Sequence, residues 1–475
     1  MIELSRAKLF LENFFIYGFI TVLNKVLSLF LLPVMTRLLP DTSSFGVSEM
    51  FNVIVGFATP LAILGLYDAM FREFFEKDDE QYKYNVTTTT ARIVLASSTI
   101  ISLVLLIFNS FFSKLFFDTS QYRDIVIYSS ISLIFSANTT IIQAPTRILN
   151  KRKVYVFSGL FQSVLSYAIA IPLIIIGFSY YGIIYSSLVT GAVMLIFFWF
   201  QNKKFFLSGT FDKKIAKELF KIGLPLVPTF LIYWIYNSTD RIMITNMLGT
   251  SQLGIYSIGA RLAQISQLIY SAFAGGWQYF AFSTMRDEDQ VDLVSRVFEY
   301  LGIISFMAFL AIVPFNNLIF SLFFKGDYVK GSTVFPYLFL SPLLLMLFQT
   351  AGNQFLVIKK SYLSTMSLAV GAGSNVVLNF LLIPRLGIVG ASIATLIGYS
   401  MSVIIVAIIN QKMGLLKVKF RFVLSALLVI LDFVVLQLQL GNMYLVNFFM
   451  IIFIVFMYKN DLKDILLKTF SNSRI

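Results

Sequence analysis

Long apolar stretches alternate with short polar ones along the whole chain, and no polar stretch is long enough to form a separate domain. Most of the apolar stretches reach the length of about 20 residues that an α-helix needs to cross a membrane. The pattern therefore predicts an all-α integral membrane protein with about 14 transmembrane helices. We expect the spans near residues 11–35, 45–71, 86–108, 123–147, 154–177, 180–201, 219–245, 251–283, 297–321, 334–358, 362–383, 388–410, 422–438 and 443–458.

The composition agrees with this interpretation, since 58% of the 475 residues are hydrophobic and only 13% are charged. A soluble domain carries about 25% charged residues, so this chain lacks the polar surface of a water-soluble globule. It also contains no cysteine and no histidine, which excludes disulfides, thiolate or imidazole metal sites and histidine acid–base catalysis. We expect no metal ion and no cofactor.

The 37 lysine and arginine residues are distributed unevenly between alternate loops. With the N-terminus placed in the cytoplasm, 26 of them fall in cytoplasmic segments and 6 in outer segments. Cytoplasmic loops of membrane proteins carry such an excess of positive charge. The distribution predicts a multi-pass protein with both termini in the cytoplasm, and it explains the net charge of +13 without a nucleic-acid partner.

Short sequence matches indicate two related halves. Phe45-Gly46 recurs as Leu253-Gly254 at an offset of 208 residues, and Tyr181-Gly182 recurs as Leu386-Gly387 at an offset of 205. Because each offset spans six helices, we expect two lobes related by a pseudo-twofold axis along the membrane normal. The expected parts are an N-terminal six-helix lobe over 1–201, a cytoplasmic linker over 202–218, a second six-helix lobe over 219–410, and two further helices with a cytoplasmic tail over 411–475.

Polar and charged residues inside the predicted spans mark the candidate functional site, because a charge at the bilayer centre costs about 3 kcal/mol or more. Cations outnumber the deep anions, so a cavity that they line suits an anionic cargo. The candidates for cargo binding are Lys25, Arg92, Arg241, Arg261 and Gln264, and the candidates for binding H⁺ or Na⁺ are Asp68 and Asp240.

Each candidate also has a structural interpretation. Arg241 can pair with a neighbouring aspartate, and Arg261 can hold two helices together within the polar stripe that it shares with Gln264. Lys25 and Arg92 can extend their charged ends to the membrane surface. The sequence alone leaves these alternatives open.

Several kinds of enzyme site are missing from the sequence. No phosphate-binding loop of the form G-x-x-x-x-G-K-[ST] occurs. The longest expected outer loops, near 109–122 and 322–333, are too short for a catalytic domain. The sequence therefore favours a transporter that is not an enzyme over a membrane polysaccharide polymerase or sugar transferase.

Three stretches carry a recognisable pattern: Leu32-Pro33-Val34-Met35-Thr36-Arg37 with the Phe45-Gly46 that follows, residues 237–257 around Asp240-Arg241, and Leu386-Gly387-Ile388-Val389-Gly390-Ala391-Ser392. They resemble bacterial polysaccharide flippases, which are the lipid-linked oligosaccharide exporters of the multidrug/oligosaccharidyl-lipid/polysaccharide (MOP) superfamily. The resemblance covers most of the chain, including the two six-helix lobes and the two extra helices.

The resemblance implies that the protein moves an undecaprenyl-pyrophosphate-linked oligosaccharide repeat unit across the bacterial cytoplasmic membrane, for assembly of O-antigen, capsule or exopolysaccharide. It implies alternating access through a cationic cavity between the lobes, at positions that here include Lys25, Arg241 and Arg261. The implied partners are the lipid bilayer, H⁺ or Na⁺, and polymerase and chain-length regulator proteins. A lipid II flippase or a cation-coupled drug exporter of the same superfamily is the alternative.

Overall fold

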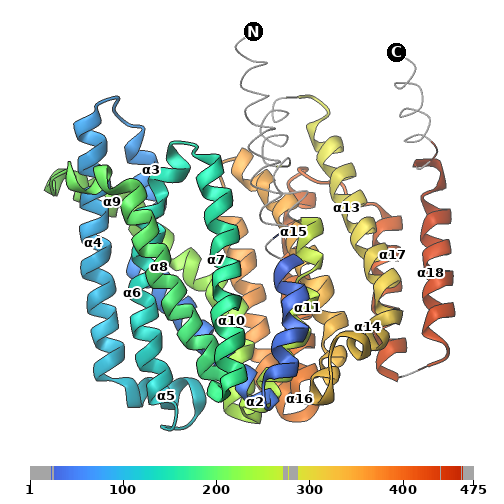
Figure 1. Ribbon diagram of the computed structural model, residues 1–475. Coiled ribbons are helices and arrows are strands. Elements are labelled where there is room, and N and C mark those ends of the chain that lie inside the picture. Colours follow the sequence, from blue (N-terminus) through green and yellow to red (C-terminus); the bar gives the residue numbers. More distant parts are fainter. Residues whose placement is uncertain are drawn as a thin grey trace. The chain divides into compact units, whose positions relative to one another are not determined.

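The computed structural model describes residue 23, residues 26–270, residue 277, residues 287–438, residues 440–461 and residue 463. Within these residues the chain is helical almost throughout and has no β-strand (Figure 1). Ten of the described helical segments are long and apolar enough to cross a membrane, and two shorter apolar helices, Val26–Leu38 and Met443–Met457, accompany them. The expected fold class of an all-α integral membrane protein is confirmed.

The chain forms two compact units, each built from more than one stretch of sequence. The first contains Met1–Arg261, Phe324–Gly331 and Asn375–Ala394. The second contains Leu262–Phe323, Ser332–Ser374 and Thr395–Ile475.

In the first unit, α6 is the central helix, since it packs against α2, α4 and α8 (Figure 1). The helices of this unit are α2 (Thr42–Ile63), α3 (Leu66–Phe74), α4 (Glu80–Ile107), α5 (Asn109–Phe117), α6 (Arg123–Ile148), α7 (Arg152–Leu173), η1 (Ile174–Phe178), α8 (Tyr180–Leu207), α9 (Lys213–Gly223), η2 (Leu224–Leu226), α10 (Val227–Leu248) and α11 (Thr250–Ala263).

Small and hydroxylated side chains allow these helices to pack closely. Ser129 of α6 is fully buried and donates to the carbonyl of Ile125 at 2.7 Å, so its hydroxyl is satisfied within its own helix. Between helices, the Asn202 amide of α8 donates to the Ile142 carbonyl and to the Thr146 hydroxyl of α6, both at 2.9 Å. Such contacts replace the hydrophobic effect, which does not hold helices together inside a lipid bilayer.

The span expected at 45–71 is broken into α2 and α3. Leu64 and Gly65 both have positive φ angles, of 55° and 71°, and α2 already contains Pro60. A Cβ at Gly65 would lie 2.2 Å from the carbonyl oxygen of Gly223, because α3 packs against α9. The break therefore results from a close approach that only glycine permits.

The longest helix, α16 (Tyr362–Lys412), is 51 residues long but is folded back on itself at Gly387. Gly387 has φ 60° and ψ −142°, and a Cβ at Gly390 would lie 2.4 Å from the carbonyl oxygen of Leu382. Its two halves match the spans expected at 362–383 and 388–410.

The same reversal joins α7 to α8, and it corrects the register of one sequence repeat. Ser179, not Gly182, has the turn conformation of Gly387, with φ 49° and ψ −132°. Gly182 lies three residues later in a tight contact with Ile174, as Gly390 does with Leu382. The structural offset between the turns is therefore 208 residues, as for Phe45-Gly46 and Leu253-Gly254, and not the 205 of the sequence match.

The second unit is built around α15. Of the residues in the apolar stretch of this helix, 83% are buried. Its helices are α13 (Gln290–Ile312), η3 (Val313–Phe315), α14 (Asn316–Phe323), α15 (Phe335–Val357), the outer parts of α16, α17 (Phe420–Leu438) and α18 (Met443–Met457), and η4 (Gly326–Thr333) is shared between the units. The final two expected spans, 422–438 and 443–458, are thus helices.

An ionic cluster fixes α17 and α18 to α13. Glu299 of α13 accepts from Arg421 at 2.6 Å and pairs with Lys419 at 3.1 Å. Arg421 also binds Asp461, just beyond α18, and this hydrogen bond holds the pKa of the Asp461 carboxyl below its usual value. The last two helices are therefore attached to the second unit by charge as well as by apolar packing.

The reversal in α16 generates a first prediction. Gly387→Ala should lower the free energy of unfolding by about 1–3 kcal/mol, because a side chain is strained in this backbone conformation. Gly373→Ala in the same helix is the matched control, since nothing lies within 4 Å of a Cβ there and its φ is ordinary. Thermal unfolding of the purified full chain in detergent measures both variants, and equal effects would contradict the proposed strain.

Candidate functional site

A buried carboxylate, Glu49, lies two turns into α2. Asp41 caps this helix by accepting from the backbone N–H of Ser44 at 2.7 Å, which fixes where α2 begins. The Glu49 side chain is only 6% exposed. A buried carboxylate of this kind requires a partner, because removal of its charge from water is unfavourable.

Two arginines supply the partners. Arg261 of α11 donates to Glu49 Oε1, and the Nε of Arg241 in α10 lies 3.7 Å from Glu49 Oε2. The Arg261 guanidinium also lies 4.9 Å from the ring centroid of Phe45, one turn before Glu49. We call Glu49, Arg241, Arg261 and Phe45 the Glu49 cluster.

Close contact between the backbones of α2 and α11 makes this cluster possible. A Cβ at Gly46 would lie 1.9 Å from the carbonyl oxygen of Thr250, and a Cβ at Gly254 would lie 1.9 Å from that of Thr42. Only glycine allows this separation, and the contact is reciprocal at an offset of 208 residues.

Hydroxyl groups repeat the same reciprocity at the start of the two helices. The hydroxyls of Thr42 and Ser251 are 2.6 Å apart, and those of Ser43 and Thr250 are also 2.6 Å apart. The N-terminal turns of α2 and α11 are therefore joined by two hydrogen bonds around a local twofold relation.

A second carboxyl, Asp240, lies beside the cluster on α10. It is 3% exposed, and it accepts from the Tyr256 hydroxyl and, at 3.2 Å, from the backbone N–H of Arg241. Because the Glu49 carboxylate is buried beside Arg241 and Arg261, the excess of positive charge at this place is smaller than the sequence suggested.

The structure brings together two of the candidate binding residues, Arg241 and Arg261, through Glu49. Lys25 lies outside the described residues. Asp68 lies on α3 near the Arg147 guanidinium, which donates to the neighbouring Tyr67 hydroxyl at 3.0 Å.

Gln264 does not continue the helix that carries Arg261. α11 ends at Ala263, and i→i+3 hydrogen bonds tighten the turn that follows, including the bond from Gln267 N to Gln264 O at 2.9 Å. Gln264 itself is exposed in this turn. The polar stripe that Arg261 was expected to share with Gln264 is therefore interrupted at this turn.

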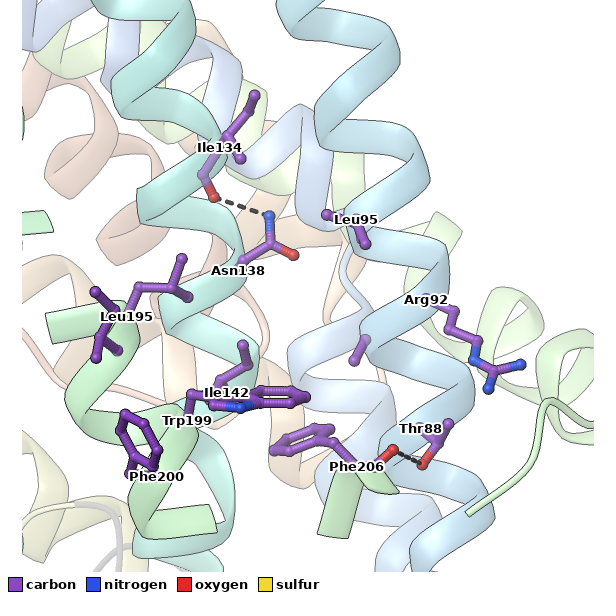
Figure 2. A pocket seen from close by; sticks show the side chains of 12 residues that line it. Thr88, Arg92, Leu95, Ile134, Asn138, Ile142, Leu195, Trp199, Phe200 and Phe206 are labelled. Carbon is purple, nitrogen blue, oxygen red and sulfur yellow. Dashed lines mark hydrogen bonds between the residues drawn. The ribbon is translucent and has the colours of Figure 1, made fainter. Parts of the chain in front are cut away.

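Arg92 lies at a separate, largely apolar cavity of about 650 Å³ between α4, α6 and α8. Trp199, Phe200 and Phe206 line it, and Asn138 contributes a polar group that donates to the Ile134 carbonyl at 2.8 Å. Figure 2 shows that the Arg92 guanidinium lies on the side of α4 away from Trp199. This cavity suits an apolar chain, with a cation at its edge.

Glu49 is not among the candidate site residues named from the sequence. One signal was present, because Phe45, Gly46 and Glu49 are spaced by three and four residues and therefore share one face of α2. That face meets α11, where the glycines cross.

The family described as polysaccharide biosynthesis protein matches residues 34–330, more than half of the chain and every residue of the Glu49 cluster. The chain belongs to this family. The resemblance to the polysaccharide flippases of the MOP superfamily is thereby confirmed.

Two curated relatives match part of the chain. The uncharacterized membrane protein MJ1068 of Methanocaldococcus jannaschii is 27% identical over 194 residues, which is 40% of this chain and 38% of that protein. The probable low-salt glycan biosynthesis flippase Agl15 of Haloferax volcanii is 23% identical over 212 residues, which is 44% of each chain. The chain thus spans less than half the length of these relatives.

Solved structures share the fold over a greater length. Lipid II flippase MurJ in an inward closed conformation has a TM-score of 0.68 at 16% identity, covering 97% of this chain and 99% of that one. A multidrug resistance MATE family transporter of the MOP superfamily, in an inward-facing conformation, has a TM-score of 0.58 at 15% identity, covering 82% and 98%. At these identities the likeness shows the fold.

The Glu49 cluster generates a second prediction. Glu49→Gln should destabilise the protein by less than the roughly 3–5 kcal/mol typical of a broken, fully buried ion pair, because the Arg261 side chain is 35% exposed. The double variant Glu49→Gln/Arg261→Gln should lose less free energy of unfolding than the sum of the losses in the two single variants.

The control for this cycle is Glu218→Gln, which breaks the exposed pair between Glu218 and Lys221 at 3.5 Å. It should change the free energy of unfolding by no more than about 1 kcal/mol. Thermal unfolding of the purified protein measures all variants, and strictly additive losses at Glu49 and Arg261 would mean that their pairing does not stabilise the fold.

Proposed function

We propose that the protein is a flippase for an oligosaccharide linked through pyrophosphate to a polyprenyl carrier such as undecaprenol. It acts in the cytoplasmic membrane during assembly of a surface polysaccharide, transports its cargo and carries out no chemical reaction. The observation that carries this proposal is the convergence of Arg241 and Arg261, from two helices, on the buried carboxylate of Glu49.

Pyrophosphate and a carboxylate present similar acceptor oxygens to a guanidinium group, and pyrophosphate presents more of them with a larger charge. Arginine binds such groups through two parallel hydrogen bonds. Contacts of this kind are stronger in a site shielded from water than in bulk solvent. In the proposed mechanism the cargo pyrophosphate therefore displaces Glu49 from Arg241 and Arg261.

Displacement of Glu49 also provides a link to alternating access. Arg261 and Glu49 lie on the same two helices, α11 and α2, whose N-terminal turns are joined by hydroxyl pairs. Binding of the cargo removes one connection between these helices. We propose that the helices then separate at this end, as alternating access requires of a membrane transporter.

A lipid II flippase is the second candidate function, and the fold likeness to MurJ favours it. The arginine pair does not distinguish these two functions, since lipid II is also a pyrophosphate-linked glycan lipid. The family match and the flippase-named relative favour the polysaccharide precursor. A cation-coupled drug exporter fits less well, because the two arginines would repel a cationic drug.

Coupling to an ion gradient is a further part of the proposal. Asp240, beside Arg241, is the better placed candidate for binding H⁺ or Na⁺, and Asp68 on α3 is the other. Polymerase and chain-length regulator proteins are the proposed partners on the pathway. Flipping measured with and without a gradient of each ion separates coupled from uncoupled transport.

The arginine pair provides the test of the proposed function. Arg241→Gln and Arg261→Gln should each slow flipping by about 10- to 100-fold, since a hydrogen bond to a charged group contributes about 1.5–3 kcal/mol. Arg261→Lys should retain part of the rate, because lysine keeps the charge but not the two parallel bonds. The assay is counterflow of a labelled prenyl-pyrophosphate oligosaccharide in proteoliposomes.

Lys221→Gln is the matched control, because that side chain is 75% exposed and lies on α9. Its flipping rate should equal that of the unaltered protein. Normal flipping in both arginine variants, at equal protein insertion, would show that the arginines only hold helices together.

The hydroxyl pairs provide a test of alternating access. The chain contains no cysteine, so Ser43→Cys/Thr250→Cys introduces one pair at a place where the hydroxyl oxygens are 2.6 Å apart. Oxidation should stop flipping, and a reductant should restore it.

Thr146→Cys/Asn202→Cys is the control, because it joins α6 and α8, which pack together and which the proposed mechanism does not separate, at groups that lie 2.9 Å apart. Its oxidation should leave flipping unchanged. If the oxidised Ser43→Cys/Thr250→Cys protein flips at the same rate as its reduced form, the start of α2 and the start of α11 do not separate during transport.

A further inference from the structure

A second cavity in the first unit, of about 410 Å³, is lined mainly by uncharged polar groups. It lies between α6, α7 and α8, and Ser28 also borders it. Serine, threonine and glutamine make up most of its lining, and none of the described residues that line it is charged. Neither the Glu49 cluster nor the apolar cavity beside Arg92 shares a residue with it.

The polar lining arises from the spacing of residues on each helix. On α6, Ser136, Thr139 and Gln143 are spaced by three and four, so they share one face, and Gln162 of α7 and Thr190 of α8 face the same cavity. Three helices therefore turn polar faces toward one space inside a membrane protein. Such faces are unfavourable against lipid, and they mark a path or a binding site for a polar ligand.

Two of the lining hydroxyls lack a hydrogen-bond partner among the described residues, Thr139 Oγ1 and Thr190 Oγ1. Thr190 is only 4% exposed, so its hydroxyl is well buried. Hydroxyls that serve helix packing are usually satisfied, as is that of Thr140, which donates to the Ser136 carbonyl at 2.8 Å. The two unpartnered hydroxyls therefore indicate that this space takes up a polar group.

We infer that this cavity binds the sugar rings of the cargo, and that it favours uncharged sugars. This inference rests on the proposed function. A sugar hydroxyl both donates and accepts, as do the hydroxyl and amide groups of the lining. The volume lies within the range of about 300–1,000 Å³ of small-molecule pockets. The ring of Tyr167 adds an apolar surface for the face of a sugar.

The absence of charge from the described lining determines which sugars fit. An acidic sugar would lose its hydration without gaining a cation from these residues, whereas a neutral sugar exchanges hydrogen bonds with water for hydrogen bonds with hydroxyl and amide groups. The cargo is thus recognised in two places of the first unit, the pyrophosphate at the Glu49 cluster on α2 and the neutral sugars beside α6. These two helices pack against each other.

Cysteine protection tests this division, because the chain has no cysteine of its own. Three single variants report on three places: Ser136→Cys on the polar cavity, Asn237→Cys on the arginine site, one turn from Arg241, and Ser208→Cys on the exposed surface beyond α8. Each is labelled with a water-soluble thiol reagent in the full chain. The probes are a prenyl pyrophosphate carrying a neutral oligosaccharide, the same lipid with an acidic oligosaccharide, and the bare prenyl pyrophosphate.

The inference predicts that the neutral glycolipid slows labelling at Ser136→Cys at least fivefold more than the bare lipid or the acidic glycolipid does. All three lipids should protect Asn237→Cys, and none should protect Ser208→Cys. Protection at Asn237→Cys without any at Ser136→Cys overturns the sugar site and leaves the proposed function standing. Equal protection of Ser136→Cys by the acidic glycolipid overturns the preference for neutral sugars. No protection at either position contradicts the proposed function itself.

The two unpartnered hydroxyls allow a second test, which distinguishes sugar binding from a role in helix packing. Thr139→Val and Thr190→Val should each weaken protection by the neutral glycolipid by about 2- to 10-fold, the worth of one hydrogen bond. Their thermal stability should be unchanged or higher, because each removes a hydroxyl without a partner. Thr146→Val is the control, since its hydroxyl accepts from Asn202 at 2.9 Å, and it should lose stability but keep protection. Loss of stability with unchanged protection in Thr139→Val and Thr190→Val would overturn the inference.

Discussion

The ionic contact between Glu49 and Arg261 is the interaction on which the proposed site depends. A carboxylate that is 6% exposed within a membrane-spanning helix needs a cation, and it receives one from α11 and a second, at 3.7 Å, from α10. Arg261 reaches Glu49 because Gly46 and Gly254 let the backbones of α2 and α11 approach to a distance that no side chain allows. The backbone contact thus brings the charges of Arg261 and Glu49 within reach of each other.

The sequence predicted the helical membrane fold well, because hydropathy responds to the length of an apolar stretch. It predicted the division of α16 near Gly387, between the spans expected at 362–383 and 388–410, but it did not predict the break at Gly65. The break at Gly65 depends on the close approach of the Gly223 backbone, and such an approach leaves no trace in local hydropathy. The register of one repeat match, Tyr181-Gly182 with Leu386-Gly387, differs from the structural register for another reason. Glycine suggested the turn at residue 182, but Ser179 has the left-handed conformation in the first half.

The candidate site was predictable in part. Arg241 and Arg261 were identified because a cation within a span is costly enough to signal a function or a partner. Glu49 was not among the candidates, and only the crossing of α2 and α11 shows that it is buried beside Arg261. The polar cavity escaped notice for a different reason. Serine, threonine and glutamine are common in membrane helices, and the spacing of Ser136, Thr139 and Gln143 gains meaning only when α7 and α8 turn their own polar faces toward it.

The two sites differ in the kind of selectivity that their chemistry permits. An arginine pair responds to charge and to the geometry of acceptor oxygens, which are the same in every pyrophosphate-linked carrier, so it recognises the class of cargo. Hydroxyl and amide groups respond to the pattern of donors and acceptors on a sugar, which differs from one glycan to another. In the proposed mechanism, a residue change at the Glu49 cluster therefore affects every cargo of the class, whereas a change at Ser136, Thr139 or Thr190 alters the choice among glycans. Because the two sets of residues are on different helices of one unit, the glycan preference can change while the arginine pair stays intact.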